Sequence, residues 1–98
     1  MVKLLRVVPS EKADKKWKAI FQTDQGREKT THFGARGMQD YTMHHDTERR
    51  KRYRERHKKD LATNDPTRAG FLSYYLLWGD STNLSSNIEA YRRRFGLS

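Results

Sequence analysis

The densest chemistry in the sequence lies between residues 46 and 59, where cationic side chains crowd together. This stretch holds eight Lys or Arg against three acidic residues, a surplus of five positive charges within a net charge of +9 for the whole chain. Such a surface favours an anionic partner: nucleic acid, an acidic protein face or lipid headgroups. The candidate binding residues, here and near the C-terminus, are Arg49, Arg50, Arg52, Arg54, Arg56, Lys58, Lys59, Arg92, Arg93 and Arg94.

Two uses of this basic stretch remain open from the sequence. Several Lys and Arg on one helix would neutralise phosphates and release counterions, which gives binding a steep salt dependence. No homeodomain, zinc-finger or zipper signature accompanies them, so sequence-specific reading of DNA is not indicated. The simpler interpretation is a charged helix that faces solvent or a protein. Glu48, Glu55 and Asp60 interleave with the cations, which favours ion pairs with a partner protein over smooth tracking of phosphates.

A second set of residues has the types found in metal-dependent nucleases. Such a centre needs two or three converging ligands and a general base. No His pair four residues apart is present, and the chain has no Cys for a structural zinc. We therefore predict no enzyme, no metal and no cofactor, with the carboxylates capping turns or helix starts and the imidazoles packing beside them. The residues concerned are Asp40, His44, Asp46 and His57.

One α+β domain spanning residues 1–98 is expected to position these side chains. The chain is 34% apolar and has eleven aromatic residues, enough for a small core. Residues 1–33 predict a small antiparallel sheet with strands near 2–8, 16–23 and 28–33, and Gly26 suits the turn at 24–27. Aromatic side chains of this part could stack bases, although burial against the helices is favoured. They are Trp17, Phe21, Phe33 and Tyr41.

Residues 40–96 predict three helices on or beside the sheet. The basic helix would begin after Asp46 and bury a narrow seam with Tyr53 and His57. The second, expected at 66–78 as the central core helix, has Asp65 at its cap and Pro66 at its first position, with Gly79 just past its end.

The third helix is expected to start near residue 82 and to close at Gly96. Its apolar stripe, Leu84, Ile88, Tyr91 and Phe95, is expected to pack on the second helix, and docking into a groove of another protein is the alternative. Tyr74 is expected to point away from the core, towards a partner. No apolar run approaches the length that spans a bilayer, and the N-terminus is too short and too charged for a signal peptide.

A longer string of residues carries a resemblance to a known family. The string is His32, Phe33, Gly34, Gly37, Asp40, Tyr41, Thr42, His44, Asp46, Arg49, Tyr53, Arg56, His57, Asp65, Pro66, Ala69, Gly70, Phe71, Leu77, Trp78, Ile88, Arg94 and Phe95. It resembles a family of small basic proteins encoded by large DNA viruses of algae and amoebae, over about residues 17–96. Residues 1–16 have no counterpart, and Gly79 and Asp80 depart from the family's pattern.

The resemblance implies a viral origin and a place in the virus particle, with the host cytoplasm or nucleus as the location during assembly. The function we expect from the sequence is that of a non-catalytic structural protein, a minor capsid or cement-type component that binds larger shell proteins through the basic helix. The alternative is a sequence-nonspecific accessory protein that binds the DNA or RNA of the viral genome. The moderate net charge and the interleaved acids favour the first.

Overall fold

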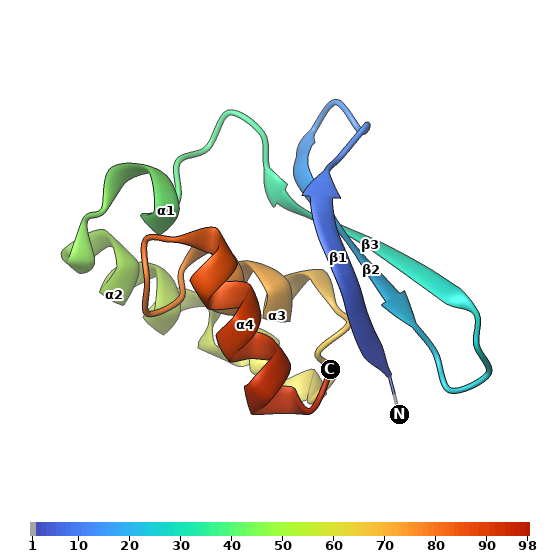
Figure 1. The fold of residues 1–98 in the computed structure, drawn as a ribbon. Helices are drawn as coiled ribbons and strands as arrows, with labels where there is room; N and C mark the ends of the chain where they lie inside the picture. The colour runs from blue at the N-terminus through green and yellow to red at the C-terminus, as the bar shows by residue number, and fades with distance from the viewer. Residues whose placement is uncertain (1) are drawn as a thin grey trace.

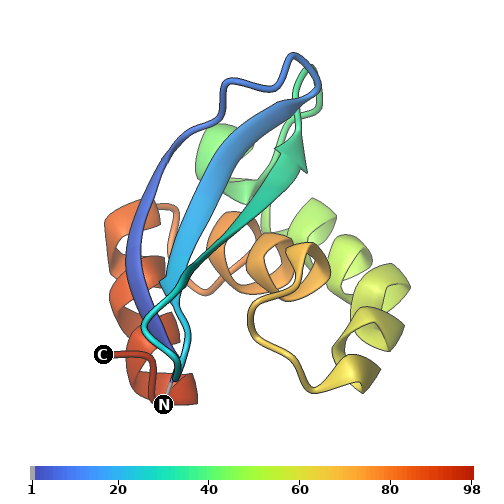
Figure 2. The same cartoon turned by 90° about the vertical axis from the view of Figure 1, so that its right-hand side faces the viewer.

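The computed structural model describes residues 2–98 and shows an antiparallel sheet whose one face is covered by helices (Figures 1 and 2). The strands are β1 (Lys3–Pro9), β2 (Lys15–Gln22) and β3 (Glu28–Ala35), and their order in the sheet is β1-β2-β3. The predicted α+β class, with three N-terminal strands followed by helices, is confirmed.

The register of the strands puts the apolar side chains of the sheet on the face that meets the helices. Leu4 pairs with Phe21 across β1 and β2, and Trp17 pairs with Phe33 across β2 and β3. Leu4, Phe21 and Phe33 are buried in one cluster with the helical core, so these aromatic rings serve packing, as expected. Gly26 has a φ of 79° in the turn between β2 and β3, a conformation that glycine adopts without strain.

The helical part contains more elements than the sequence predicts, and across residues 2–98 none is long and apolar enough to cross a membrane. A short helix, α1, precedes the basic helix, and the basic helix itself ends at His57, two residues before the end of the basic stretch at residue 59. The elements are α1 (Tyr41–His44), α2 (Thr47–His57), the 3₁₀-helix η1 (Lys58–Thr63), α3 (Ala69–Leu72), the π-helical turn η2 (Ser73–Leu77) and α4 (Leu84–Phe95).

The prediction that the core helix begins at Pro66 is wrong, because a local turn competes with it. The Asp65 carboxylate accepts hydrogen bonds from the amide of Thr67 at 3.0 Å and from its hydroxyl at 2.7 Å, which also lower the pKa of Asp65. The Thr67 carbonyl in turn accepts from the Thr31 hydroxyl at 2.7 Å, which ties the turn to β3. Arg68 is extended, so the helix begins at Ala69.

α4 follows the expected pattern and holds the ends of the chain together. Asn83 caps its start by accepting from the Ser86 amide, and Gly96 ends it with a φ of 62°. The Arg92 guanidinium donates to the carbonyls of Leu4 and Leu5 at 3.0 and 3.1 Å, so the C-terminal part of α4 lies beside β1 (Figure 1). Arg92 therefore stabilises the fold from within.

Gly79 follows the core helix as predicted, but for a different physical reason. Its φ lies outside the left-handed region, so no helix-terminating turn requires glycine here. A Cβ at this position would lie 2.2 Å from the Tyr75 carbonyl oxygen and 2.9 Å from the Asn87 side chain. Close approach of the backbone to these two groups therefore requires glycine.

Candidate functional site

The arginines of α2 form two rows with different surroundings. The first, which we call the inner row, consists of Arg50 and Arg54, both half-buried. Arg50 donates from Nε to the Gly79 carbonyl at 2.6 Å and from Nη2 to the carboxylate of Asp80, and Arg54 reaches the same carboxylate at 3.3 Å. The inner row thus binds the loop that follows η2.

The inner row also covers aromatic rings. The Arg54 guanidinium lies 4.5 Å from the centre of the Tyr74 ring, and that of Arg50 lies 5.5 Å from the Tyr41 ring. Tyr74 is half-buried under this contact. Among the described residues, Tyr74 does not belong to the core cluster, so it points away from the core as expected, and its contact with a partner stays a prediction.

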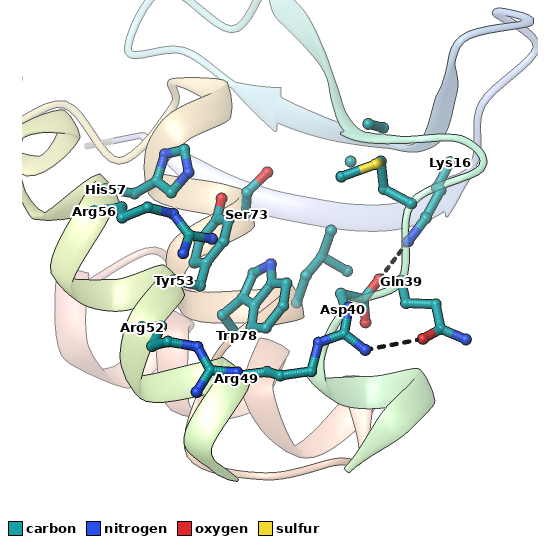
Figure 3. Close-up of a pocket in the computed structure, with 14 residues that line it drawn as sticks. Lys16, Gln39, Asp40, Arg49, Arg52, Tyr53, Arg56, His57, Ser73 and Trp78 are labelled. Atoms are coloured by element: carbon teal, nitrogen blue, oxygen red, sulfur yellow. Dashed lines mark hydrogen bonds and ion pairs between the residues drawn. The ribbon is translucent and has the colours of Figure 1, made fainter. Parts of the chain in front are cut away.

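The second row, the groove row, consists of Arg49, Arg52 and Arg56, all exposed. Spacings of three and four residues place them on one stripe of the helix, and they line one wall of a groove of about 490 Å³. At 1.5 Å per residue, the stripe spans about 10 Å. Figure 3 shows the facing wall, which comes from β2, from the end of β3 and from the segment after it. Its residues are Lys16, Gly34, Ala35, Met38, Gln39 and Asp40.

A stack of aromatic rings supports the floor of the groove. The Tyr53 ring lies between those of His57 and Trp78, with centroid distances of 4.1 and 4.2 Å and interplanar angles of 22° and 5°. Figure 3 shows the Tyr53 ring between the other two. Burial raises the pKa of Tyr53 to about 12, so its hydroxyl remains protonated at neutral pH. Both faces of the Tyr53 ring are covered. The groove therefore presents to a ligand the edges of the stacked rings and the Tyr53 hydroxyl.

The charges of the groove are unbalanced. Among the residues that line it in the described chain, Asp40 is the one carboxylate, and it is buried. Asp40 accepts from the Lys16 ammonium at 2.6 Å, so these two charges compensate each other (Figure 3). Arg49 donates to the neutral Gln39 side chain at 3.1 Å. Among the described residues, therefore, no carboxylate forms an ion pair with the arginines of the groove row.

The acidic residues of α2 lie off the groove. Glu48 and Glu55 line hollows on the outer side of the helix together with Lys51, and one of these hollows is also bordered by Arg52 and Arg56 of the groove row. Within residues 2–98, no ion pair joins either glutamate to the groove row. The two glutamates therefore lie near Arg52 and Arg56 without forming ion pairs with them.

The carboxylates and imidazoles considered for catalysis mainly organise the backbone. Asp40 and Asp46 are the N-caps of α1 and α2, as the simpler interpretation predicts. Asp46 accepts from the amides of Arg49 and Glu48, which lowers the pKa of Asp46. Within the described chain, no group of three His, Asp or Glu side chains could hold a metal ion. Asp40 and His57 line the groove from opposite walls, whereas His44 and Asp46 do not line it.

The structure thus gathers three of the ten predicted cationic residues into one groove. Lys58, Lys59 and Arg93 are exposed elsewhere, and the Arg94 guanidinium lies 5.0 Å from the Tyr75 ring centre. The spacing of the groove row is visible in the sequence as a helical stripe. The residues of the other wall carry no such signal, because they come from β2, from the end of β3 and from the segment after it.

Comparison with known proteins assigns the chain to a family. A model described as a family of unknown function (DUF5754) matches residues 5–57. The chain belongs to this family. The segment matched by the DUF5754 model runs from β1 to the end of α2, so it contains the groove row and the facing wall but not Trp78 on the floor. It also includes part of the N-terminal stretch for which the viral resemblance offers no counterpart. No curated protein and no solved structure matches the chain.

Proposed function

We propose that the protein binds nucleic acid without sequence specificity, as an accessory protein of a viral genome, and that the groove is its phosphate-binding surface. The observation that carries this proposal is the groove row, three arginines facing a groove whose carboxylate is already paired with Lys16. Interleaved acids favour a protein partner at the level of sequence. Within residues 2–98, however, neither Glu48 nor Glu55 forms an ion pair with these arginines, so the interleaved acids leave the three guanidinium groups available to phosphate.

The dimensions of the row suit a polyphosphate backbone. Three arginines spread over about 10 Å face a strand that carries one charge per about 3.4 Å of duplex axis, so two or three phosphates lie within reach. Guanidinium groups form paired, charge-assisted hydrogen bonds with phosphate oxygens. Contacts of this type carry no sequence information, because they do not reach base edges.

The test is the binding of random-sequence oligonucleotides across a salt series, measured by fluorescence anisotropy. The groove triple, Arg49→Ala, Arg52→Ala and Arg56→Ala, is expected to weaken binding strongly. It should also reduce the slope of log K against log salt by about 2, from about 0.7 per lost phosphate contact on a single strand. Circular dichroism should show an intact fold, because the three side chains are exposed.

A matched control removes the same charge from outside the groove. The outer triple, Lys51→Ala, Lys58→Ala and Arg93→Ala, changes three exposed cations that do not line the groove. We expect it to retain most of the affinity and of the salt slope. If both triple variants lost the same affinity, binding would depend on net charge alone and not on the groove. Negligible binding by the wild-type protein at physiological salt would refute the proposal.

A different surface favours the second candidate, a minor capsid or cement-type component of the particle. Met38 and Met43 are 65% and 55% exposed and border a hollow that Pro9 and Trp17 also line. Exposed, flexible methionines suit contacts with another protein. In purified particles, this candidate predicts chemical cross-links from the hollow to one larger shell protein, and fewer copies of a Met38→Ser, Met43→Ser variant per particle. Normal incorporation of that variant would count against it.

A further inference from the structure

We infer that the groove accepts a single strand of nucleic acid in preference to a duplex, an inference that rests on the proposed function and names its ligand class. The two walls of the groove lie close enough for one direct hydrogen bond to join them. Arg49 of α2 donates to Gln39 of the facing wall at 3.1 Å (Figure 3). Arg52 and Arg56 also border the outer hollow, but a ligand that contacts all three arginines from the groove must lie between the walls.

A duplex meets a geometric obstacle at this groove. Proteins that read a duplex with a helix insert that helix into a major groove about 12 Å wide, with its cationic side chains projecting towards the two backbones. On α2 the groove row faces a protein wall and an aromatic floor instead. The helix therefore cannot enter the major groove of a duplex with the groove row pointing towards the bases. A rigid duplex would approach α2 from its outer side.

The outer side of α2 is a poorer surface for phosphate than the groove. Its hollows are lined by Glu48 and Glu55 among the cations of the helix, so the two carboxylates offset part of the positive charge there. A duplex backbone laid along this side would bring phosphates close to both carboxylates, which repel them. A single strand avoids this repulsion, because the acid that lines the groove, Asp40, is already paired with Lys16.

The contact between Arg49 and Gln39 can be exchanged for a phosphate. The Gln39 acceptor is neutral, and a hydrogen bond from a guanidinium to a charged phosphate oxygen is stronger than one to an amide. Entry of a strand would thus replace this contact and leave bases beside Met38 on the facing wall. The polarisable thioether of methionine packs against aromatic rings of any shape, which fits binding without sequence preference.

The experiment compares a single-stranded oligonucleotide with a hairpin duplex of the same length and composition, at one salt concentration. We expect the single strand to bind at least tenfold tighter. The Trp17→Phe variant leaves Trp78, on the groove floor, as the sole indole, and its fluorescence should change with the single strand. Oxidation by dilute peroxide gives a second readout in the wild-type protein: the single strand should protect Met38, which lines the groove, more than Met43, which does not.

Each outcome has a distinct meaning. Tighter binding of the single strand, with selective protection of Met38, supports the inference. A duplex that binds equally well or better, or protection of both methionines alike, overturns the inference while the proposed function stands. Binding of neither ligand above the level of the groove triple refutes the proposed function itself. The Glu48→Gln, Glu55→Gln variant adds an internal check: duplex affinity should rise several-fold, with little change for the single strand.

Discussion

Inner row and groove row belong to the same helix and consist of the same residue type, yet they have different neighbours. Arg50 binds a carbonyl and a carboxylate of the loop after η2, whereas the side chain of Arg52, two residues further on, has no hydrogen bond or ion pair within residues 2–98. The difference arises in the loop that contains Gly79 and Asp80, some thirty residues away. Charge in a small basic domain thus divides into a part that stabilises the fold and a part available to a partner.

Disruption of the loop that receives the inner row should have the largest effect. In Gly79→Ala, the new Cβ would lie 2.2 Å from the Tyr75 carbonyl oxygen, so the loop must shift and take the Arg50 acceptor with it. We expect the free energy of unfolding to fall by more than about 3 kcal/mol. Gly26→Ala is the control, since its Cβ meets open space and only its positive φ is strained. A loss no larger than that of the control would mean that the loop is free to move.

Removal of the rows one at a time tests the comparison directly. The variant Arg50→Ala, Arg54→Ala loses a charged hydrogen bond to the Gly79 carbonyl and the contact with Tyr74, and should lose about 2 kcal/mol of stability in urea unfolding. Its matched variant, Arg49→Ala, Arg52→Ala, should lose less than about 0.5 kcal/mol but most of the oligonucleotide affinity. Equal effects of both variants on stability and on binding would show that the two rows are one surface.

Much of the fold was predictable because its signals are local. The strand pattern, the turn at Gly26, the cap at Asp46 and the end of α4 at Gly96 each depend on residues within a few positions. The start of the core helix was not predictable in this way, although Pro66 is a favourable first helical residue. The turn made by Asp65 and Thr67 is held by a hydrogen bond to β3. This bond joins residues far apart in the sequence, so no local pattern predicts it.

The candidate site was predictable only in part for the same reason. A helical stripe of arginines can be read from the sequence, and so can the pairing of Tyr53 with His57 on one face. The separation of inner row from groove row depends on Asp80, and the pairing of Asp40 with Lys16 joins positions 24 residues apart. Which cations are already compensated is therefore a property of the tertiary structure.

The pKa of His44 should respond to the charge of the groove row but not to that of the inner row, so a pH titration of His44 tells the two rows apart. Burial lowers the pKa of His44 below its ordinary 6.5, and the charge of Arg49 lowers it further, whereas the neighbouring Asp46 and Asp40 raise it. The unfolded chain therefore takes up this proton first as the pH falls. The stability that neutral His44 contributes is complete above about 6.5 and is lost as the pH falls through the lowered value.

The titration can be followed by NMR in matched variants. Arg49→Ala is expected to move the pKa of His44 back towards its ordinary value, while Arg54→Ala of the inner row should leave it unchanged. Thermal unfolding should agree: the difference in stability between the wild-type protein and His44→Asn should change below about pH 6.5 and stay constant above it. A shift of the same size in both arginine variants would mean that the imidazole responds to net charge alone.

The smallest expected effect comes from the acid that the two inner arginines share. The Asp80 side chain is 95% exposed, so its ion pairs are screened by water and should contribute only about 0.5 kcal/mol. Asp80→Asn keeps an acceptor oxygen but removes the negative charge, leaving Arg50 and Arg54 uncompensated. Because neither lines the groove, the affinity for oligonucleotides should rise by less than about twofold through long-range attraction. Glu89→Gln, which removes the partner of Arg92 on α4, is a control with the same change in net charge. Affinity in Asp80→Asn that rises far beyond this control would place the inner row in the binding surface, and the division between the rows would then depend on one exposed carboxylate.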